Sequence, residues 1–153
     1  VNFGIIYGVS AFGLSNQTDL SRTEAKDLID TYYKTYPKLR NYISEQIDFA
    51  REHGYVQTVL GRRRYLKDIN AGNQVVRGAA ERNAVNAPIQ GSAADIIKIA
   101  MINIHNKLSG GKYKTKMLLQ VHDELVFDCY KPELEEMKKH IKTEMEHAYP
   151  LAV

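Results

Sequence analysis

The sequence is short of several features, and each shortage narrows what the protein can be. Cys129 is the only cysteine among 153 residues, which excludes an internal disulfide and a cysteine-based zinc site. Every apolar run is shorter than the span of a bilayer, and the first residues do not have the pattern of a secretory signal peptide. Internal repeats and low-complexity tracts are also missing. We therefore expect a protein of the reducing cytoplasm without a membrane partner.

The remaining composition is that of an ordinary globular chain. Hydrophobic residues make up 44% of the sequence and charged residues 25%. A chain of this length fits one domain or a piece of one. Because the sequence begins with Val1 rather than methionine, we expect an excised fragment of a longer protein.

The net charge of +3 is modest, but basic residues concentrate in the middle of the sequence. Between residues 51 and 82 there are seven basic side chains and three acidic ones. The basic ones are Arg51, Arg62, Arg63, Arg64, Lys67, Arg77 and Arg82. Such a segment can attract phosphates, with binding that weakens as salt rises, or it can form a solvated face. Charge alone slightly favours the solvated face.

Residues 117–128 have the pattern of a β-hairpin. Two apolar runs, each as long as a short strand, flank His122 and Asp123, which we place at or beside the turn. The adjacent acids Asp123 and Glu124 could form a simple solvated hairpin tip. However, like charges beside apolar strands repel each other unless a cation is present, so the pair is also a candidate metal or catalytic site.

Helical patterns fill most of the remaining sequence. A capping box at Ser21 and Glu24 predicts a helix start, and Pro37 ends that helix or opens the next one, which stops at Gly54. The tyrosines between these points could stack on bases, but their spacing favours packing. Residues 55–60 are typical of a short extended segment. We therefore predict an α+β fold that is mostly helical and has an antiparallel hairpin at residues 117–128.

A further helix should begin near Gln74 and be broken or kinked at Pro88. The helix that restarts near residue 91 is apolar on nearly all sides, which is typical of a helix buried in a larger protein. Between the two, Asn86 and Gln90 could read base edges or cap the helix break, and this segment alone favours capping. Pro132 should open a final amphipathic helix.

Residues 1–13 combine aromatic side chains with three glycines and no charge. If the first half is helical, Phe3 and Tyr7 share one face. The glycine spacing matches neither a dinucleotide-binding nor a Walker fingerprint. Spacing alone therefore favours a buried helix end.

Three separated stretches together resemble family A DNA polymerases of bacteria. Residues 1–8 (VNFGIIYG) resemble the second half of the family's fingers-helix motif. Residues 86–95 (NAPIQGSAAD) resemble a palm helix segment, and residues 120–127 (QVHDELVF) resemble the last catalytic palm motif. The order and separation of the three make the resemblance specific. It implies a fingers region at about residues 1–75 and a palm region at about residues 76–153.

The resemblance also implies a role for the hairpin acids. Asp123 would be a ligand of the divalent metal ions, Mg²⁺, that align the primer 3′ hydroxyl and the dNTP for phosphoryl transfer. Glu124 would be the neighbouring catalytic acid, with a supporting role. Successive side chains on a strand point to opposite faces, so both acids can ligate one ion identically only if the turn rotates them.

Further residues would contact nucleotide and DNA by the same resemblance. Phe3 and Tyr7 would bind the incoming nucleotide. The DNA-contacting residues would be Ser10, Phe12, Arg77, Arg82, Asn86, Gln90, Gln120 and His122. Minor-groove acceptors are similar in all correct base pairs, so polar contacts there sense pair geometry without reading sequence.

Other parts of the family's site should lie outside this sequence: the arginine and lysine of the fingers helix, the first metal-binding aspartate, the thumb, the exonuclease domain and a final strand. We expect the intact protein to be a DNA-directed DNA polymerase of the bacterial cytoplasm and nucleoid. Its partners would be primer-template DNA, dNTP and the rest of the polymerase chain. The fragment alone should not polymerise DNA, because charge neutralisation at the reacting phosphates would be incomplete.

Two other functions stay open at this point. A single-subunit phage-type RNA polymerase shares the fingers tyrosine and the palm fold, although the triplet at residues 122–124 looks more like the DNA enzymes. The chain could also be a non-catalytic nucleic-acid-binding module that uses its basic segment alone.

Overall fold

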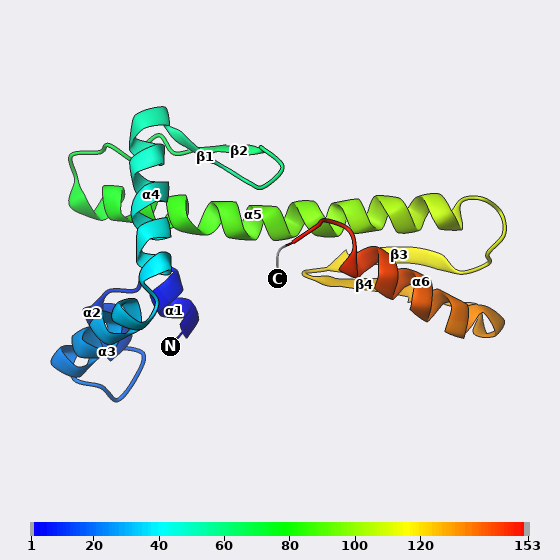
Figure 1. Cartoon of the computed structure of the whole chain (residues 1–153), viewed down its shortest axis with the longest axis horizontal. Helices are drawn as coiled ribbons and strands as arrows, with labels where there is room; N and C mark the ends of the chain where they lie inside the picture. The colour runs from blue at the N-terminus through cyan, green and yellow to red at the C-terminus, as the bar shows by residue number, and fades with distance from the viewer. Residues whose placement is uncertain (1, 152–153) are drawn as a thin grey trace. The chain divides into compact units, whose positions relative to one another are not determined.

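The computed structural model describes residues 2–151, and the chain divides into two compact units, Val1–Gln90 and Gly91–Val153. Helices dominate, and two small antiparallel sheets are found among the described residues (Figure 1). The predicted helix-rich α+β class is therefore confirmed. Each helix within residues 2–151 is too short or too polar to cross a bilayer.

Four helices open the first unit: α1 (Asn2–Ile6), α2 (Ala11–Ser15), α3 (Arg22–Thr35) and α4 (Pro37–His53). The Ser21 hydroxyl accepts a hydrogen bond from the Glu24 amide, and the Glu24 carboxylate accepts one from the Ser21 amide. Pro37 lies in the first turn of α4, and Gly54 ends α4 with a left-handed φ of 76°. These boundary predictions are confirmed.

A short hairpin follows, in which β1 (Tyr55–Gln57) pairs with β2 (Arg63–Tyr65). Val56 is buried in a core that joins α4, this hairpin, the following loop and the first part of α5 (Gln74–Leu108). The core consists of Ala50, Val56, Leu66, Ile69, Ala80, Ala84 and Ala87. It holds the basic hairpin against the helix that carries half of the predicted DNA-contacting residues.

Of the two outcomes predicted at Pro88, a break or a kink, helix α5 contradicts the break. It begins at Gln74 as predicted, but its helical backbone continues through Pro88 for 35 residues in all. A proline removes one backbone hydrogen bond and crowds the preceding turn, and tertiary packing can outweigh that cost. Here Ala84, Val85 and Ala87 are buried just before Pro88, which is itself buried.

The continuous helix also corrects the capping interpretation of Asn86 and Gln90. No helix end lies between residues 74 and 108, so neither side chain caps one. The first 17 residues of α5, up to Gln90, belong to the first unit and the remainder to the second. The side chains of Asn86 and Gln90 are therefore available for roles other than capping.

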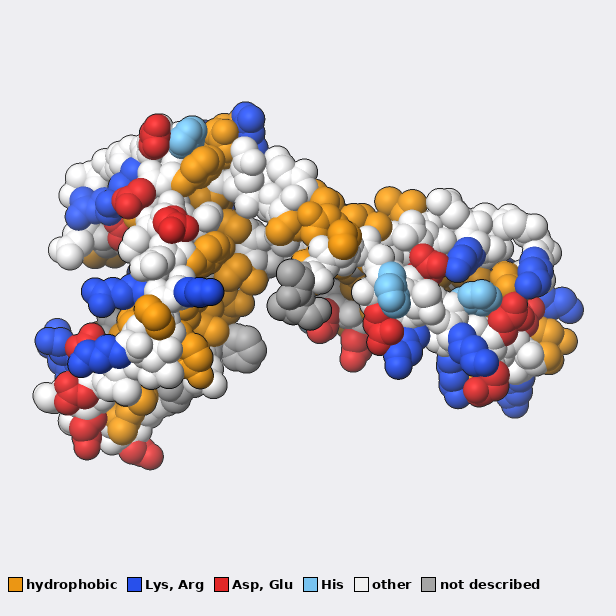
Figure 2. All heavy atoms as spheres, viewed as in Figure 1, with side chains coloured by type: hydrophobic (Ala, Val, Ile, Leu, Met, Phe, Trp, Pro, Cys, Tyr) orange, Lys and Arg blue, Asp and Glu red, His pale blue; other side chains and the backbone are white. Residues whose placement is uncertain are grey.

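The second unit adds the strands β3 (Lys116–Val121) and β4 (Glu124–Asp128), the 3₁₀ turn η1 (Lys131–Glu133) and helix α6 (Leu134–Glu146). The strands form the predicted antiparallel hairpin. Met117 pairs with Phe127 and Leu119 with Val126, so β3 carries one extra residue, a β-bulge, at Leu118. On the face shown in Figure 2, basic and acidic side chains of this unit are intermixed.

Candidate functional site

The hairpin of the second unit presents the candidate catalytic acids at its turn. Strand β3 ends at Val121, β4 begins at Glu124, and these two residues pair across the strands. His122 and Asp123 therefore form a two-residue turn, and residues 122–124 are all exposed. The exposed turn leaves room for ligands around both carboxylates.

The turn has an unusual backbone conformation. His122 has a φ of 53°, the only positive φ of a non-glycine residue within residues 2–151. Two-residue hairpin turns need a positive φ at their first central residue, which glycine, asparagine or aspartate usually supplies. For a residue with a larger side chain the left-handed region costs about 1–2 kcal/mol. Gln120 contacts this turn, because its Nε2 donates a hydrogen bond to the carbonyl oxygen of His122 at 2.6 Å.

The chemistry of the two acids fits Mg²⁺. Carboxylate oxygens are ligands that Mg²⁺ prefers, and its sites commonly combine one or two carboxylates with substrate phosphates and water. Within residues 2–151, no group of three or more His, Cys, Asp or Glu side chains could hold a metal ion. Asp123 and Glu124 therefore fit one side of a Mg²⁺ site that needs further ligands from substrate, water or other parts of a protein.

In the first unit, α1 ends close to the predicted nucleotide-binding tyrosine. Tyr7 follows α1 and is half-buried, whereas the side chain of Phe3 lies outside the described part of the structure. The Tyr33 hydroxyl of α3 donates a hydrogen bond to the carbonyl of Ile5 at 3.1 Å. Burial raises the pKa of Tyr33 above its ordinary value, so this hydroxyl stays a proton donor. Helix α3 thereby holds the end of α1.

A glycine turn brings α1 close to α5. Gly8 has a φ of 78°, and its amide donates to the carbonyl of Ile5 at 3.0 Å. A side-chain carbon placed on Gly8 would lie 3.5 Å from Cγ of Arg82. The structure therefore brings Arg82 beside the turn that directly follows Tyr7.

Two of the predicted DNA-contacting residues, Ser10 and Phe12, lie at the start of α2. The hydroxyl of Ser10 caps this helix by accepting a hydrogen bond from the Gly13 amide at 3.0 Å. Phe12 is exposed, and Cζ of Arg22 lies 6.0 Å from the centre of its ring. Ser10 thus has a structural role, and Phe12 offers an apolar ring to solvent.

Arg82, Asn86 and Gln90 follow one another at four-residue steps along α5, so they lie on one side of the helix. Arg82 and Gln90 are exposed. The Oδ1 atom of Asn86 is buried and has no hydrogen-bond partner within residues 2–151. A buried acceptor in this state is unfavourable, so a ligand or water that donates to Asn86 would stabilise the site.

Arg77 is engaged inside the first unit. Its Nη1 donates to the carbonyl of Ala71 at 3.0 Å, and its Nε lies 3.8 Å from Oε1 of Glu81. These contacts hold the loop before α5 in place. A contact between Arg77 and DNA would have to use the part of the guanidinium that these partners leave accessible.

The structure also forms an open groove of about 580 Å³ that the sequence does not reveal. Its lining joins residues of β2, the following loop and α5: Arg64, Tyr65, Leu66, Lys67, Asp68, Val75, Val76, Ala79, Ala80 and Asn83. Nη2 of Arg64 donates to Oδ1 of Asn83 at 3.4 Å. The basic triplet at residues 62–64 is the sequence signal for this groove, but the packing of the hairpin on α5 creates it.

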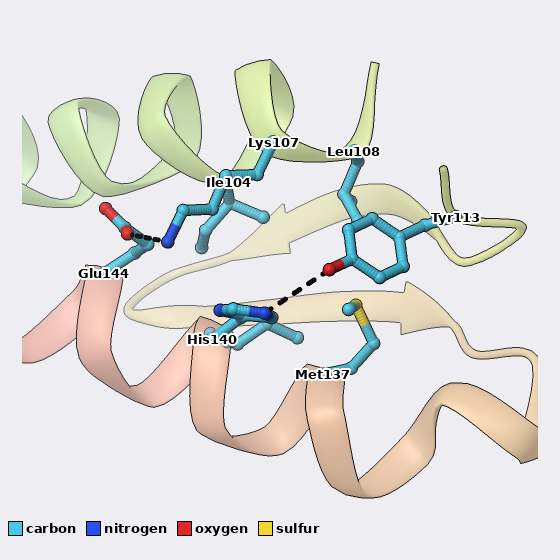
Figure 3. Close-up of a pocket in the computed structure, with 8 residues that line it drawn as sticks. Ile104, Lys107, Leu108, Tyr113, Met137, His140 and Glu144 are labelled. Carbon is cyan, nitrogen blue, oxygen red and sulfur yellow. Dashed lines mark hydrogen bonds and ion pairs between the residues drawn. The ribbon is translucent and has the colours of Figure 1, made fainter. Parts of the chain in front are cut away.

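The small pocket of the second unit is a packing gap. Ile104 and Leu108 of α5, Tyr113, and Met137 and His140 of α6 surround it, and an ion pair between Lys107 and Glu144 lies beside it (Figure 3). Its volume of about 10 Å³ is at the lower limit for a single water molecule. A substrate or cofactor therefore does not fit there.

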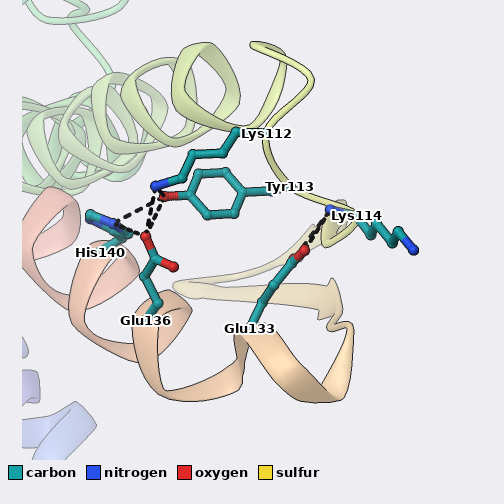
Figure 4. Close-up of polar contacts among 6 residues, drawn as sticks. All are labelled: Lys112, Tyr113, Lys114, Glu133, Glu136 and His140. Carbon is teal, nitrogen blue, oxygen red and sulfur yellow. Dashed lines mark hydrogen bonds and ion pairs between the residues drawn. The ribbon is translucent and has the colours of Figure 1, made fainter.

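A polar network supports the base of the hairpin (Figure 4). The Tyr113 hydroxyl donates to the Glu136 carboxylate at 2.6 Å and Lys112 Nζ donates at 3.0 Å, and these bonds lower the pKa of Glu136 to about 2. The Glu133 carboxylate accepts hydrogen bonds from the Thr115 hydroxyl at 2.6 Å and from the amides of residues 114 and 115. The hydrogen bond from the Thr115 hydroxyl contributes most to lowering the pKa of Glu133. These acids hold the start of β3 rather than a ligand.

Comparison with known proteins finds similarity to one family over the whole chain. A family model described as DNA polymerase family A matches residues 1–153. DNA polymerase I of Streptococcus pneumoniae is 57% identical over 153 residues, and that of Lactococcus lactis subsp. lactis is 51% identical over 153 residues. All of this chain is covered in both cases, and it spans 17% of the length of each of these curated relatives.

One solved structure is also very similar. It is described as the POL domain of Pol1 from M. smegmatis in complex with DNA primer-template and dNTP. The two share 47% sequence identity with a TM-score of 0.95, and the match covers 99% of this chain and 27% of that chain. The likeness therefore extends through both compact units.

Proposed function

Because the chain belongs to DNA polymerase family A, we propose that it is part of a DNA-directed DNA polymerase that adds dNTPs to the 3′ hydroxyl of a primer. The observation that carries this proposal is the family match over residues 1–153, which includes the hairpin with its adjacent acids. The match favours the DNA enzymes over a phage-type RNA polymerase or a non-catalytic binding module. The relatives are bacterial, which supports action on nucleoid DNA in the cytoplasm.

In this proposal the hairpin turn is the catalytic element. Asp123 is a ligand of Mg²⁺, and Glu124 supports it as the neighbouring acid. Two bound Mg²⁺ ions would supply the charge neutralisation and alignment that phosphoryl transfer requires. The exposed positions of both carboxylates, with oxygen atoms of the type that Mg²⁺ prefers, support the assignment. His122 and Gln120 lie at the same turn and would contact the primer end.

The first unit would bind nucleotide and template. Phe3 and Tyr7 would contact the incoming dNTP, and Ser10 and Phe12 the template strand. Arg82, Asn86 and Gln90 would touch the primer-template from one side of α5, and Arg77 would add positive charge. The unsatisfied Oδ1 of Asn86 and the position of Arg82 next to Gly8 support a shared binding surface. We assign about residues 1–75 to a fingers region and about residues 76–153 to a palm region.

The hairpin also has an exposed apolar face that other parts of a longer polymerase chain could cover. Alternation along the strands puts Leu119, Val121 and Val126 on one face with Glu124. These three apolar side chains are 50%, 44% and 40% exposed. We propose that the rest of the polymerase chain covers this face and completes the metal site, so the 153 residues alone do not polymerise DNA.

The test uses the full-length polymerase and a matched pair of variants on one hairpin. Asp123→Asn should abolish primer extension while leaving primer-template binding largely intact, because it removes a metal ligand without removing DNA contacts. Asp128→Asn removes an exposed carboxylate at the other end of β4 and should leave extension unchanged. Retained extension in Asp123→Asn would refute the metal-ligand role.

A further inference from the structure

We propose that Gln120 is a positioning residue: its side-chain amide holds the His122–Asp123 turn and thereby orients the Asp123 carboxylate. The inference rests on the proposed function of this hairpin. Its basis is the hydrogen bond from Gln120 Nε2 to the carbonyl oxygen of His122, 2.6 Å long and fully at the surface. The bond joins the end of β3 to the backbone immediately before Asp123.

The turn needs such support because of its backbone. His122 has a φ of 53°, and the left-handed region is favourable for glycine but not for a residue with a large side chain. Strained conformations persist where the surrounding structure fixes them. The Val121–Glu124 pair closes the turn from the strand side, and the Gln120 amide holds it at the carbonyl.

Holding that carbonyl also restricts the orientation of Asp123. The carbonyl of His122 and the amide nitrogen of Asp123 belong to one planar peptide group. When the oxygen is fixed, the peptide plane that ends at Cα of Asp123 is fixed too, so the side chain can reorient only by rotation about the bonds of Asp123 itself. A metal ligand must be held close to its productive geometry, and a partner that orients it contributes strongly to affinity.

The resemblance assigns Gln120 to DNA contact, and the two roles predict different defects. A glutamine side chain has two N–H donors and one acceptor, so the bond to His122 uses only part of its capacity. Loss of a DNA contact weakens primer-template binding. Loss of a positioning bond loosens the turn and weakens Mg²⁺ binding, and it does not by itself change the affinity for DNA.

Gln120→Met in the full-length polymerase separates these roles, because methionine has a similar length and no N–H donor. Leu118→Met is the control, since Leu118 is an exposed residue of the same strand away from the turn. In metal-free enzyme, amide hydrogen exchange at residues 122–124 should become about fivefold faster in Gln120→Met, the change that one ordinary hydrogen bond supports. It should not change in Leu118→Met.

The second measurement is the Mg²⁺ concentration that gives half-maximal primer extension. It should rise about tenfold in Gln120→Met, as for loss of a partner that orients a metal ligand. The Kd for primer-template, measured without Mg²⁺, reports separately on the proposed primer contact of Gln120. A weaker Kd with normal turn exchange and normal Mg²⁺ dependence would overturn the inference in favour of a DNA contact.

A second background tests the strain directly. Asparagine tolerates the left-handed region better than histidine, so Gln120→Met should accelerate turn exchange less when combined with His122→Asn. An equal acceleration in both backgrounds would contradict the inference. Failure of the proposed function looks different: Asp123→Asn would then retain extension, whatever turn exchange Gln120→Met shows.

Discussion

Residues 2–151 contain two antiparallel hairpins that share a topology and differ in charge and in the contacts that hold them. The β1–β2 hairpin carries Arg62, Arg63 and Arg64, whereas the turn of the β3–β4 hairpin carries Asp123 and Glu124. The first is anchored through Val56, which is 1% exposed. The second leaves one apolar face exposed and is held at its base by hydrogen bonds to acids.

This difference suggests that the first hairpin contributes mainly to folding and the second mainly to catalysis. A hairpin that is anchored by a buried residue in its own unit can present arginines without depending on the rest of a longer chain. A hairpin with an exposed apolar face depends on partners that cover it, and its acids can then share a site with them. We therefore expect substitutions in the first hairpin to act on folding and phosphate attraction, and those in the second on catalysis.

The largest contrast in stability should come from matched valines. Val56→Ala should destabilise the first hairpin by about 2 kcal/mol, because it removes buried methyl groups and leaves a cavity. Val126→Ala on the exposed face of β4 should change the local stability of its hairpin far less. Native-state hydrogen exchange of the strand amides in the full-length protein measures both. Equal losses would show that the second hairpin is as deeply buried as the first.

The next contrast concerns phosphate attraction. Arg64→Gln at the open groove should weaken primer-template binding and reduce the slope of log Kd against log salt by about 1, as for loss of one phosphate contact. Lys139→Gln on α6 is the charge-matched control, because it removes one exposed cation far from the groove in sequence. Titrations at several salt concentrations check this. Identical slopes for Arg64→Gln and the unaltered protein would show that the groove does not bind phosphate.

A smaller effect is expected at the base of the second hairpin. Glu133→Gln replaces one carboxylate oxygen by an amide donor and removes the charge, so it weakens the hydrogen bonds from the Thr115 hydroxyl and two backbone amides, and exchange at the start of β3 should accelerate. The pKa of Glu133 is lowered in the folded protein. Its stabilising effect is therefore present above the unfolded pKa and is lost as pH falls through the folded value. At neutral pH the amides at the start of β3 should exchange faster in Glu133→Gln than in the unaltered protein. At acidic pH this difference in exchange rate should disappear.

The smallest effect should come from Glu136→Gln. Its network is fully at the surface, where ion pairs contribute little. The pKa of about 2 means that the network stabilises the fold fully above the ordinary glutamate pKa and loses its effect as pH falls toward 2. Near neutral pH, Glu136→Gln should lower the midpoint temperature of thermal unfolding slightly, and the control Glu135→Gln should lower it less. A large shift would show that this network, rather than the turn, organises the second hairpin.

The parts of the fold that the sequence predicted correctly depend on neighbouring residues. Ser21 and Glu24 satisfy each other's amides within one turn, and Gly54 ends α4 because it adopts a left-handed φ at little cost. The hairpin at residues 117–128 could be predicted for the same reason, because its two strands and its turn follow one another directly in the sequence. Each of these features is decided by chemistry within a few residues.

The acid pair, the alternating strands and the helix caps were thus determined by the sequence itself, because local hydrogen bonding and side-chain alternation suffice for them. The tertiary structure alone decided that α5 continues through Pro88, because buried contacts outweigh the local cost of the proline. It also formed the groove beside Arg64, whose partner Asn83 lies 19 residues away. Contacts of this kind depend on where distant segments pack, and no local pattern encodes that free energy.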